Sequence, residues 1–167
     1  MAAIKTLDEK FKHELGDIYD AEHQFLDAQR EMLPKATTPS VRRLLEQHIG
    51  QTEQQIGVLE RAFAALGEEA ERIKCQGAAG MVAENKKTLK DVSSSAALTD
   101  LSIAAGSVKV EHYEIVAYRS LIATAQAMGQ TKVAALLQKN LAQEEATAQK
   151  IEAGLAKLNE QALAADA

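Results

Sequence analysis

Acidic and imidazole side chains interrupt the apolar faces of the helices that this sequence predicts. Glu22 and Glu111 lie in two similar segments, in each of which a glutamate is followed by a histidine. His48 and Glu144 lie near the middle of two other helical stretches, and Glu114 follows Glu111 after one turn. Ionisable groups inside a helical bundle are costly unless something pairs them, and a metal ion is a common partner. The sequence therefore predicts a metal site with these residues as candidate ligands.

The donor set also indicates which metals to expect. Carboxylates that bridge cations, together with a neutral imidazole, suit iron, manganese or zinc. A lone glutamate on an apolar face is more often structural, because it usually lies at a helix edge where its carboxylate reaches water. Several such residues at a matching depth favour a metal site over separate structural roles, since clustered ionisable groups mark functional sites. We expect iron or manganese as the cofactor, as two ions or as one.

The elements that must position these residues are four long helices. Apolar positions that recur in steps of three and four predict helices over about 6–34, 39–66, 99–128 and 131–160. The connection over 67–98 is charged and is expected to contain a short helix from about 80 to 90. Two short connections and one long crossover are typical of the ferritin-like four-helix bundle. The prediction is an all-α fold of this kind, in a single domain over residues 1–167.

Capping residues mark the ends of the first helices. Thr6, with Glu9 three residues later, reads as a capping box. Thr38 precedes a proline at a first helical position, where the missing N–H has no effect. Gly67 and Gly129 are expected to end the second and third helices.

The later helices have less definite boundaries. Thr99 or Asp100 is expected to cap the third helix, and Thr131 the fourth. The Ala-rich segment after about residue 160 is expected to fray.

Composition argues against several classes of function. The formal net charge of −5 provides no basic face for nucleic acid, and an aromatic content of 4% leaves few platforms for base stacking. No stretch reaches the roughly 20 apolar residues that cross a bilayer, and the start of the chain lacks the apolar region of a signal peptide. Cys75 is the only cysteine, which favours a reducing compartment. We expect a cytoplasmic protein with no nucleic-acid or membrane partner.

Two segments resemble a known family. The run over 17–24 resembles the first helix of the YciE/YciF proteins, a bacterial ferritin-like group also termed DUF892. The Glu-His-Tyr-Glu-Ile run over 111–115 resembles the central signature of that family, and His48 with Thr52 falls at a matching place. The resemblance extends over about 5–158, nearly the whole chain.

The resemblance implies a ferritin-like bundle, often dimeric, with a two-metal site similar to that of rubrerythrins, in proteins associated with bacterial stress responses. Carried over by position, it gives the same ligand candidates: Glu22, His48, Glu111, Glu114 and Glu144. The chain departs from the family pattern at Gln51 and Gln143, where relatives often have acids, and it lacks the usual Glu-x-x-His pair. A single-metal or vestigial site is therefore the alternative to a dinuclear one.

Two hypotheses for function follow. The leading one is a dinuclear iron or manganese protein of oxidative or general stress, with peroxide or dioxygen as its small oxidant. Whether it is an enzyme, with peroxidase-like or catalase-like turnover, stays open. The alternative is a structural or partner-binding stress bundle whose buried acids are protonated or hydrogen-bonded. Helices with this much Ala on their surface often self-associate, so we also expect a homodimer.

Overall fold

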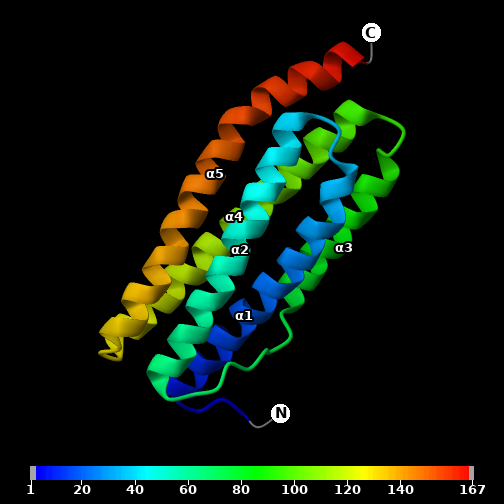
Figure 1. Ribbon diagram of the computed structural model, residues 1–167. Coiled ribbons are helices and arrows are strands. Elements are labelled where there is room, and N and C mark those ends of the chain that lie inside the picture. Colours follow the sequence, from blue (N-terminus) through cyan, green and yellow to red (C-terminus); the bar gives the residue numbers. More distant parts are fainter. Residues whose placement is uncertain (1–2, 166–167) are drawn as a thin grey trace.

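The structure is a computed structural model that describes residues 3–165 of the chain. Its regular elements within these residues are five α-helices and one 3-10 turn (Figure 1). The helices are α1 (Leu7–Met32), α2 (Pro39–Leu66), α3 (Gln76–Asp91), α4 (Ala96–Ala127) and α5 (Thr131–Ala165), and the turn η1 covers Leu33–Lys35. Residues 3–165 contain no β-strand. The two ends of the predicted domain, 1–2 and 166–167, lie outside the described residues.

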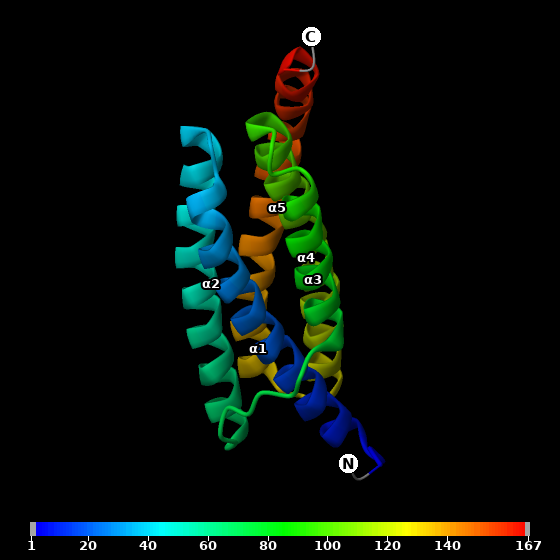
Figure 2. The same ribbon diagram turned by 90° about the vertical axis from the view of Figure 1, so that its right-hand side faces the viewer.

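Four of the helices form a ring in which each runs antiparallel to its neighbours. α1 packs against α2, α2 against α5, α5 against α4 and α4 against α1. The segment over 68–75 and α3 return the chain from the end of α2 to the opposite end of the bundle (Figure 1). Figure 2 shows α3 on the outside of the ring, where it packs against α1 and α4. Two antiparallel pairs joined by one long crossover make a ferritin-like helical bundle, which confirms the predicted fold class.

The starts of α1 and α2 are capped as the sequence predicts. Thr6 accepts a hydrogen bond from the backbone N–H of Glu9, and the Glu9 carboxylate accepts one from the N–H of Thr6, both at 3.1 Å. Thr38 caps α2 by accepting a hydrogen bond from the N–H of Val41. Gly67 ends α2 in the left-handed conformation, with a φ of 76°, which glycine adopts without strain.

Two other helix starts differ from the prediction. α3 begins at Gln76 instead of residue 80, because the thiol of Cys75 caps it by accepting a hydrogen bond from the N–H of Ala78 at 3.3 Å. α4 begins at Ala96 with Ser95 as its cap, so the predicted caps Thr99 and Asp100 lie inside the helix.

The fourth predicted helix also has different limits. Thr131 is the first residue of α5 and not its cap, and α5 continues to Ala165 instead of fraying after residue 160. Its last turns include Ala162, which is buried.

Asp100 connects α4 to the α1–α2 connection. Its carboxylate accepts hydrogen bonds from the N–H groups of Thr37 and Thr38, at 2.7 and 2.8 Å, and from the Thr37 hydroxyl at 2.8 Å. The side chain is 1% exposed. Satisfying three donors with a single buried carboxylate fixes the end of α1 and the start of α2 relative to α4.

The crossover is fixed to α1 in a similar way. The N–H of Ile73 donates to the carbonyl of Gly16 at 3.1 Å, and the N–H of Cys75 donates to the carboxylate of Asp20 at 2.8 Å. A Cβ atom at residue 16 would lie 2.9 Å from the crossover backbone. Glycine is needed there because only its small size allows this close approach.

The buried apolar side chains form two groups that are separated along the helices by polar residues. On α2, Val41 and Leu45 belong to the smaller group and Leu59 to the larger one. The buried residues His48 and Thr52 come between them. A layer of buried polar side chains therefore interrupts the core near its middle.

None of the helices within residues 3–165 is both long enough and apolar enough to span a membrane.

The substitution Asp100→Ala is expected to lower the free energy of unfolding by about 2–3 kcal/mol, because it leaves buried backbone donors without an acceptor. Urea denaturation followed by circular dichroism measures the effect. Asp91→Ala is the matched control, since Asp91 is exposed at the end of α3 and should change the stability by less than about 0.5 kcal/mol. Equal losses in the two variants would show that Asp100 does not fix the α1–α2 connection.

Candidate metal centre

The five predicted site residues project from the central parts of four helices. Glu22 comes from α1, His48 from α2, Glu111 and Glu114 from α4, and Glu144 from α5. Each side chain is at most 3% exposed. Each helix buries these residues because they share a face with its leucines and isoleucines, so the same periodicity that builds the core also carries the acids into it.

Four of these residues converge on one point. His48, Glu111, Glu114 and Glu144 each offer a ligand atom, and these atoms lie within 4.8 Å of one another. Within the group, Nε2 of His48 and Oε1 of Glu111 are 2.7 Å apart. A nitrogen and several carboxylate oxygens gathered this tightly match the donor set that divalent iron, manganese or zinc prefers.

Several candidate ligand atoms in the group have no hydrogen-bond partner within residues 3–165. These atoms include both carboxylate oxygens of Glu111 and of Glu144, and Nδ1 of His48. The short contact between His48 and Glu111 has the distance of an ion pair but not the angles of a hydrogen bond. Buried polar atoms without partners are rare in folded proteins, and a bound cation would satisfy all of these oxygens together.

Glu22 is not a member of the group of four, but it lies beside it. One of its oxygens accepts a hydrogen bond from the hydroxyl of Tyr118, and its other oxygen has no partner within residues 3–165. The Tyr118 hydroxyl accepts in turn from the amide of Asn140 at 2.9 Å, and the same amide donates to the carbonyl of Gln55 at 3.2 Å. A tyrosine hydroxyl from α4 therefore anchors the carboxylate of Glu22.

Burial dominates the electrostatics of the site. It raises the pKa of Glu111 from the usual 4.5 to about 7, and it raises the pKa values of Glu22, Glu114 and Glu144 well above that usual value. Neighbouring carboxylates add to the effect, most clearly at Glu114, whose pKa is raised further by the charges of Glu144 and Glu22. Burial lowers the pKa of His48, which keeps its imidazole neutral. The acids therefore hold protons unless a cation replaces them.

The positions where a second imidazole is expected hold other residues. Thr147 stands three residues after Glu144, and its hydroxyl donates a hydrogen bond to Gln51 at 3.3 Å. Thr147, which replaces the histidine of the Glu-x-x-His pattern, therefore pairs between α5 and α2 with Gln51, which stands where relatives often have an acid. Gln143 is half-buried and lies outside the group of four. The site has one imidazole and at least three carboxylates.

The remaining histidine and cysteine residues lie elsewhere. His112 is exposed and pairs with Glu152 at 2.7 Å. The Cys75 thiol is buried 2.9 Å from the hydroxyl of Tyr113, and burial raises its pKa, so it is a structural and not a reactive thiol. Asn140 is a site residue that the sequence analysis did not identify. Its position, three residues after Leu137, places it on the core face and could have identified it.

The free energy of unfolding of the chelator-treated protein is expected to fall as the pH rises from about 5 to about 7. A carboxyl whose pKa is raised by folding keeps its proton longer in the folded state. It stabilises that state fully below its unfolded pKa and loses this contribution as the pH passes the folded pKa. For Glu111 alone, the rise from 4.5 to about 7 corresponds to about 3 kcal/mol. The lowered pKa of His48 makes the free energy of unfolding rise with pH, but this is the effect of one group, whereas four acids act in the other direction.

Urea titrations at a series of pH values measure this slope. The variant Glu111→Gln, which cannot lose a proton, should have a shallower slope than the unsubstituted chain. A stability that is constant or rises over this range would show that these acids are not protonated in the metal-free fold.

Comparisons with known proteins place this arrangement in a family. The chain is 28% identical to the protein YciF of Escherichia coli K12 over 145 residues, which cover 86% of this chain and 87% of that protein. The crystal structure of the E. coli stress protein YciF superposes with a TM-score of 0.88 at 26% identity, covering 94% of this chain and 99% of the other. A structure titled YcfI, a putative structural protein from Rhodopseudomonas palustris, gives a TM-score of 0.87 at 32% identity, covering 89% and 94%.

A more distant structure, from Xanthomonas campestris, shares the fold with a TM-score of 0.76 at 22% identity, covering 96% of this chain and 97% of the other. The family described as a domain of unknown function, DUF892, matches residues 6–164 of this chain. The match extends from the start of α1 into the last turn of α5 and includes all five residues of the candidate centre, and the chain belongs to the DUF892 family.

Proposed function

We propose that this protein binds iron or manganese at the centre of its bundle and acts in a stress response. The observation that carries the proposal is the convergence of His48, Glu111, Glu114 and Glu144 within 4.8 Å, in a core that offers the oxygens of Glu111 and Glu144 no other partner. The stress setting is suggested by the similar E. coli structure, which is titled a stress protein.

The residues present suit one or two ions. His48, Glu111 and Glu144 would hold one ion through a neutral nitrogen and two carboxylates. Glu22 and Glu114 would hold a second, since the Glu22 carboxylate lies beside that of Glu114 and raises its pKa. When bound, iron or manganese would supply redox chemistry toward peroxide or dioxygen.

The protein itself contributes orientation and exclusion of water. The Tyr118 hydroxyl on α4 donates a hydrogen bond to the Glu22 carboxylate, and the Asn140 amide on α5 holds that hydroxyl by donating to it. The two apolar groups on either side of the site keep water away, which strengthens the attraction between the carboxylates and a cation. Protons leave the acids when the metal enters, so affinity should rise with pH.

The hydrogen bond between Gln51 and Thr147 favours a second candidate function, a structural bundle without redox chemistry. These residues stand where a second imidazole and further acids would complete a dinuclear centre. The similar structure from R. palustris is titled a putative structural protein. In this alternative the four acids stay protonated and no metal binds.

A homodimer is part of the proposal. Val116 is 66% exposed on the outer face of α4, and Leu163 is 74% exposed near the end of α5. Burial of these side chains against a second copy would remove apolar surface from water.

The substitution Glu111→Ala is expected to reduce bound metal from about one or two ions per chain to nearly none, because it removes a central carboxylate of the site. Plasma mass spectrometry on protein expressed with iron and manganese supplied measures the content. Circular dichroism should show the same helical content as the unsubstituted chain.

Glu145→Ala is the matched control. Glu145 follows Glu144 directly, but it is exposed and pairs with Arg119 at 2.7 Å, so its loss should leave the metal content unchanged. Metal that persists at full occupancy in Glu111→Ala would place the site elsewhere. If the unsubstituted chain takes up no metal and Glu111→Ala is neutral or stabilising, the structural function is the correct one.

A further inference from the structure

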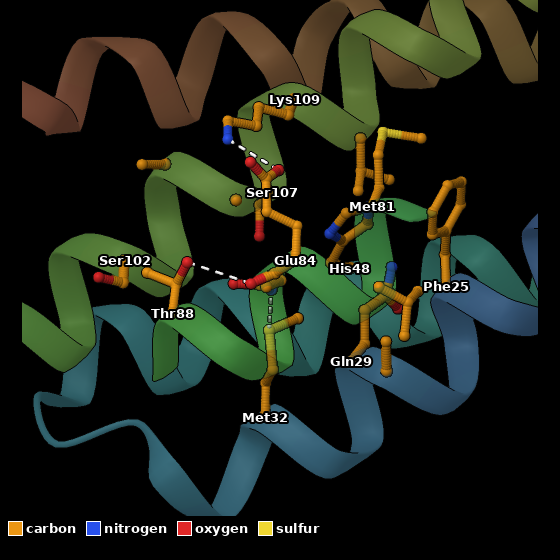
Figure 3. Close-up of a pocket in the computed structure, with 16 residues that line it drawn as sticks. Phe25, Gln29, Met32, His48, Met81, Glu84, Thr88, Ser102, Ser107 and Lys109 are labelled. Atoms are coloured by element: carbon orange, nitrogen blue, oxygen red, sulfur yellow. Dashed lines mark hydrogen bonds and ion pairs between the residues drawn. The ribbon is translucent and has the colours of Figure 1, made fainter. Parts of the chain in front are cut away.

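A cavity of about 120 Å³ lies between α1, α3 and α4, and its inner end reaches His48 (Figure 3). The larger apolar side chains that line it are Phe25, Met32, Met81, Val82 and Val110. The buried side chains of His48 and Gln29 form its inner wall, whereas the exposed residues Glu84 and Lys109 form its outer rim between α3 and α4. The cavity thus connects the outside of the crossover helix with the imidazole of the candidate metal centre.

His48 has an unsatisfied atom and also borders the cavity. Its Nε2 lies 2.7 Å from Glu111, on the side of the carboxylates. Its Nδ1 is buried and has no hydrogen-bond partner within residues 3–165. The imidazole is part of the cavity wall, so a molecule in the cavity would lie against the ring.

We propose that this cavity binds a small neutral molecule, mainly apolar and with one hydroxyl or peroxide group, such as a short-chain alcohol or organic hydroperoxide, and brings it to His48. Binding in the cavity stands on the geometry alone, while its role as the ligand site of a metal centre rests on the proposed function.

Size and charge determine the class of ligand. An apolar cavity of about 150 Å³ is large enough for a molecule the size of benzene, so this cavity exceeds the needs of a single water. Glu84 and Lys109, the two charged residues of its wall apart from His48, pair with each other at 3.0 Å. No unpaired charge is left in the wall to hold an ionic ligand. Gln29, Asn85 and Ser107 add neutral polar groups that suit a hydroxyl or peroxide oxygen.

Methionine-methyl NMR on the full chain tests the proposal, with tert-butanol as the probe. Met32 and Met81 line the cavity, whereas Met128 lies outside it and serves as an internal control. In chelator-treated protein, tert-butanol should shift the Met32 and Met81 methyl signals saturably and leave the Met128 signal unchanged. Pivalate, which has the same branched shape but carries a charge, should not.

Two variants make the assignment specific. Ala28 lies in the cavity wall, so Ala28→Leu should fill the space and weaken tert-butanol binding about tenfold or more. Ala123→Leu makes the same change at an exposed position of α4 outside the cavity and should bind as the unsubstituted chain does. If Ala28→Leu fails to fold, the titration of the unsubstituted chain still decides.

The same experiment on manganese-loaded protein distinguishes this inference from the proposed function. In manganese-loaded protein, the paramagnetic ion should broaden the signal of bound tert-butanol, because the ligand lies beside a metal-bound His48. Saturable binding without manganese uptake would support the cavity while the proposed function fails. Manganese uptake without saturable methionine shifts would overturn the cavity proposal and leave the metal site standing. Equal shifts at Met128, equal binding of pivalate, or undiminished binding in Ala28→Leu would each overturn it as well.

Discussion

The burial of several carboxylates in one layer of the bundle is the constraint on which the rest of the structure depends. Charged acids at that depth would repel one another and lose their hydration, and the raised pKa values of Glu22, Glu114 and Glu144 express this cost. The two groups of buried apolar side chains, one on each side of the layer, offset this cost by holding the helices together. A site that is costly without a cation is, for the same reason, one that a cation stabilises.

The crossover determines which part of this layer can be reached from the protein surface. A bundle of four helices alone would expose the groove between α1 and α4, but α3 packs against both helices there. Its position is set by the close approach of residues 71–73 to Gly16 and by the hydrogen bond from Cys75 to Asp20. The space that remains beneath α3 is the cavity that leads to His48. The connection between the two helix pairs is therefore also a wall of the site.

Much of this arrangement follows from local patterns in the sequence. Glu22, His48, Glu111 and Glu144 could be identified because each stands in phase with apolar neighbours, and the capping box at Thr6 needs no tertiary contact. Asp100 could not be assigned correctly, because a helix cap and a carboxylate that binds a loop 63 residues away look the same in sequence. The start of α3 was missed because its cap is a cysteine, which is not among the residues that usually cap helices.

His48 connects the candidate metal centre with the cavity beneath α3. Its Nε2 lies 2.7 Å from a carboxylate oxygen of Glu111, and its ring is part of the cavity wall. Its Nδ1 is buried without a hydrogen-bond partner within residues 3–165. A proton on Nδ1 leaves the free lone pair on Nε2, which is the nitrogen beside the carboxylates and the one that would bind a metal. One imidazole ring would therefore hold a cation and border the space for a small molecule at the same time.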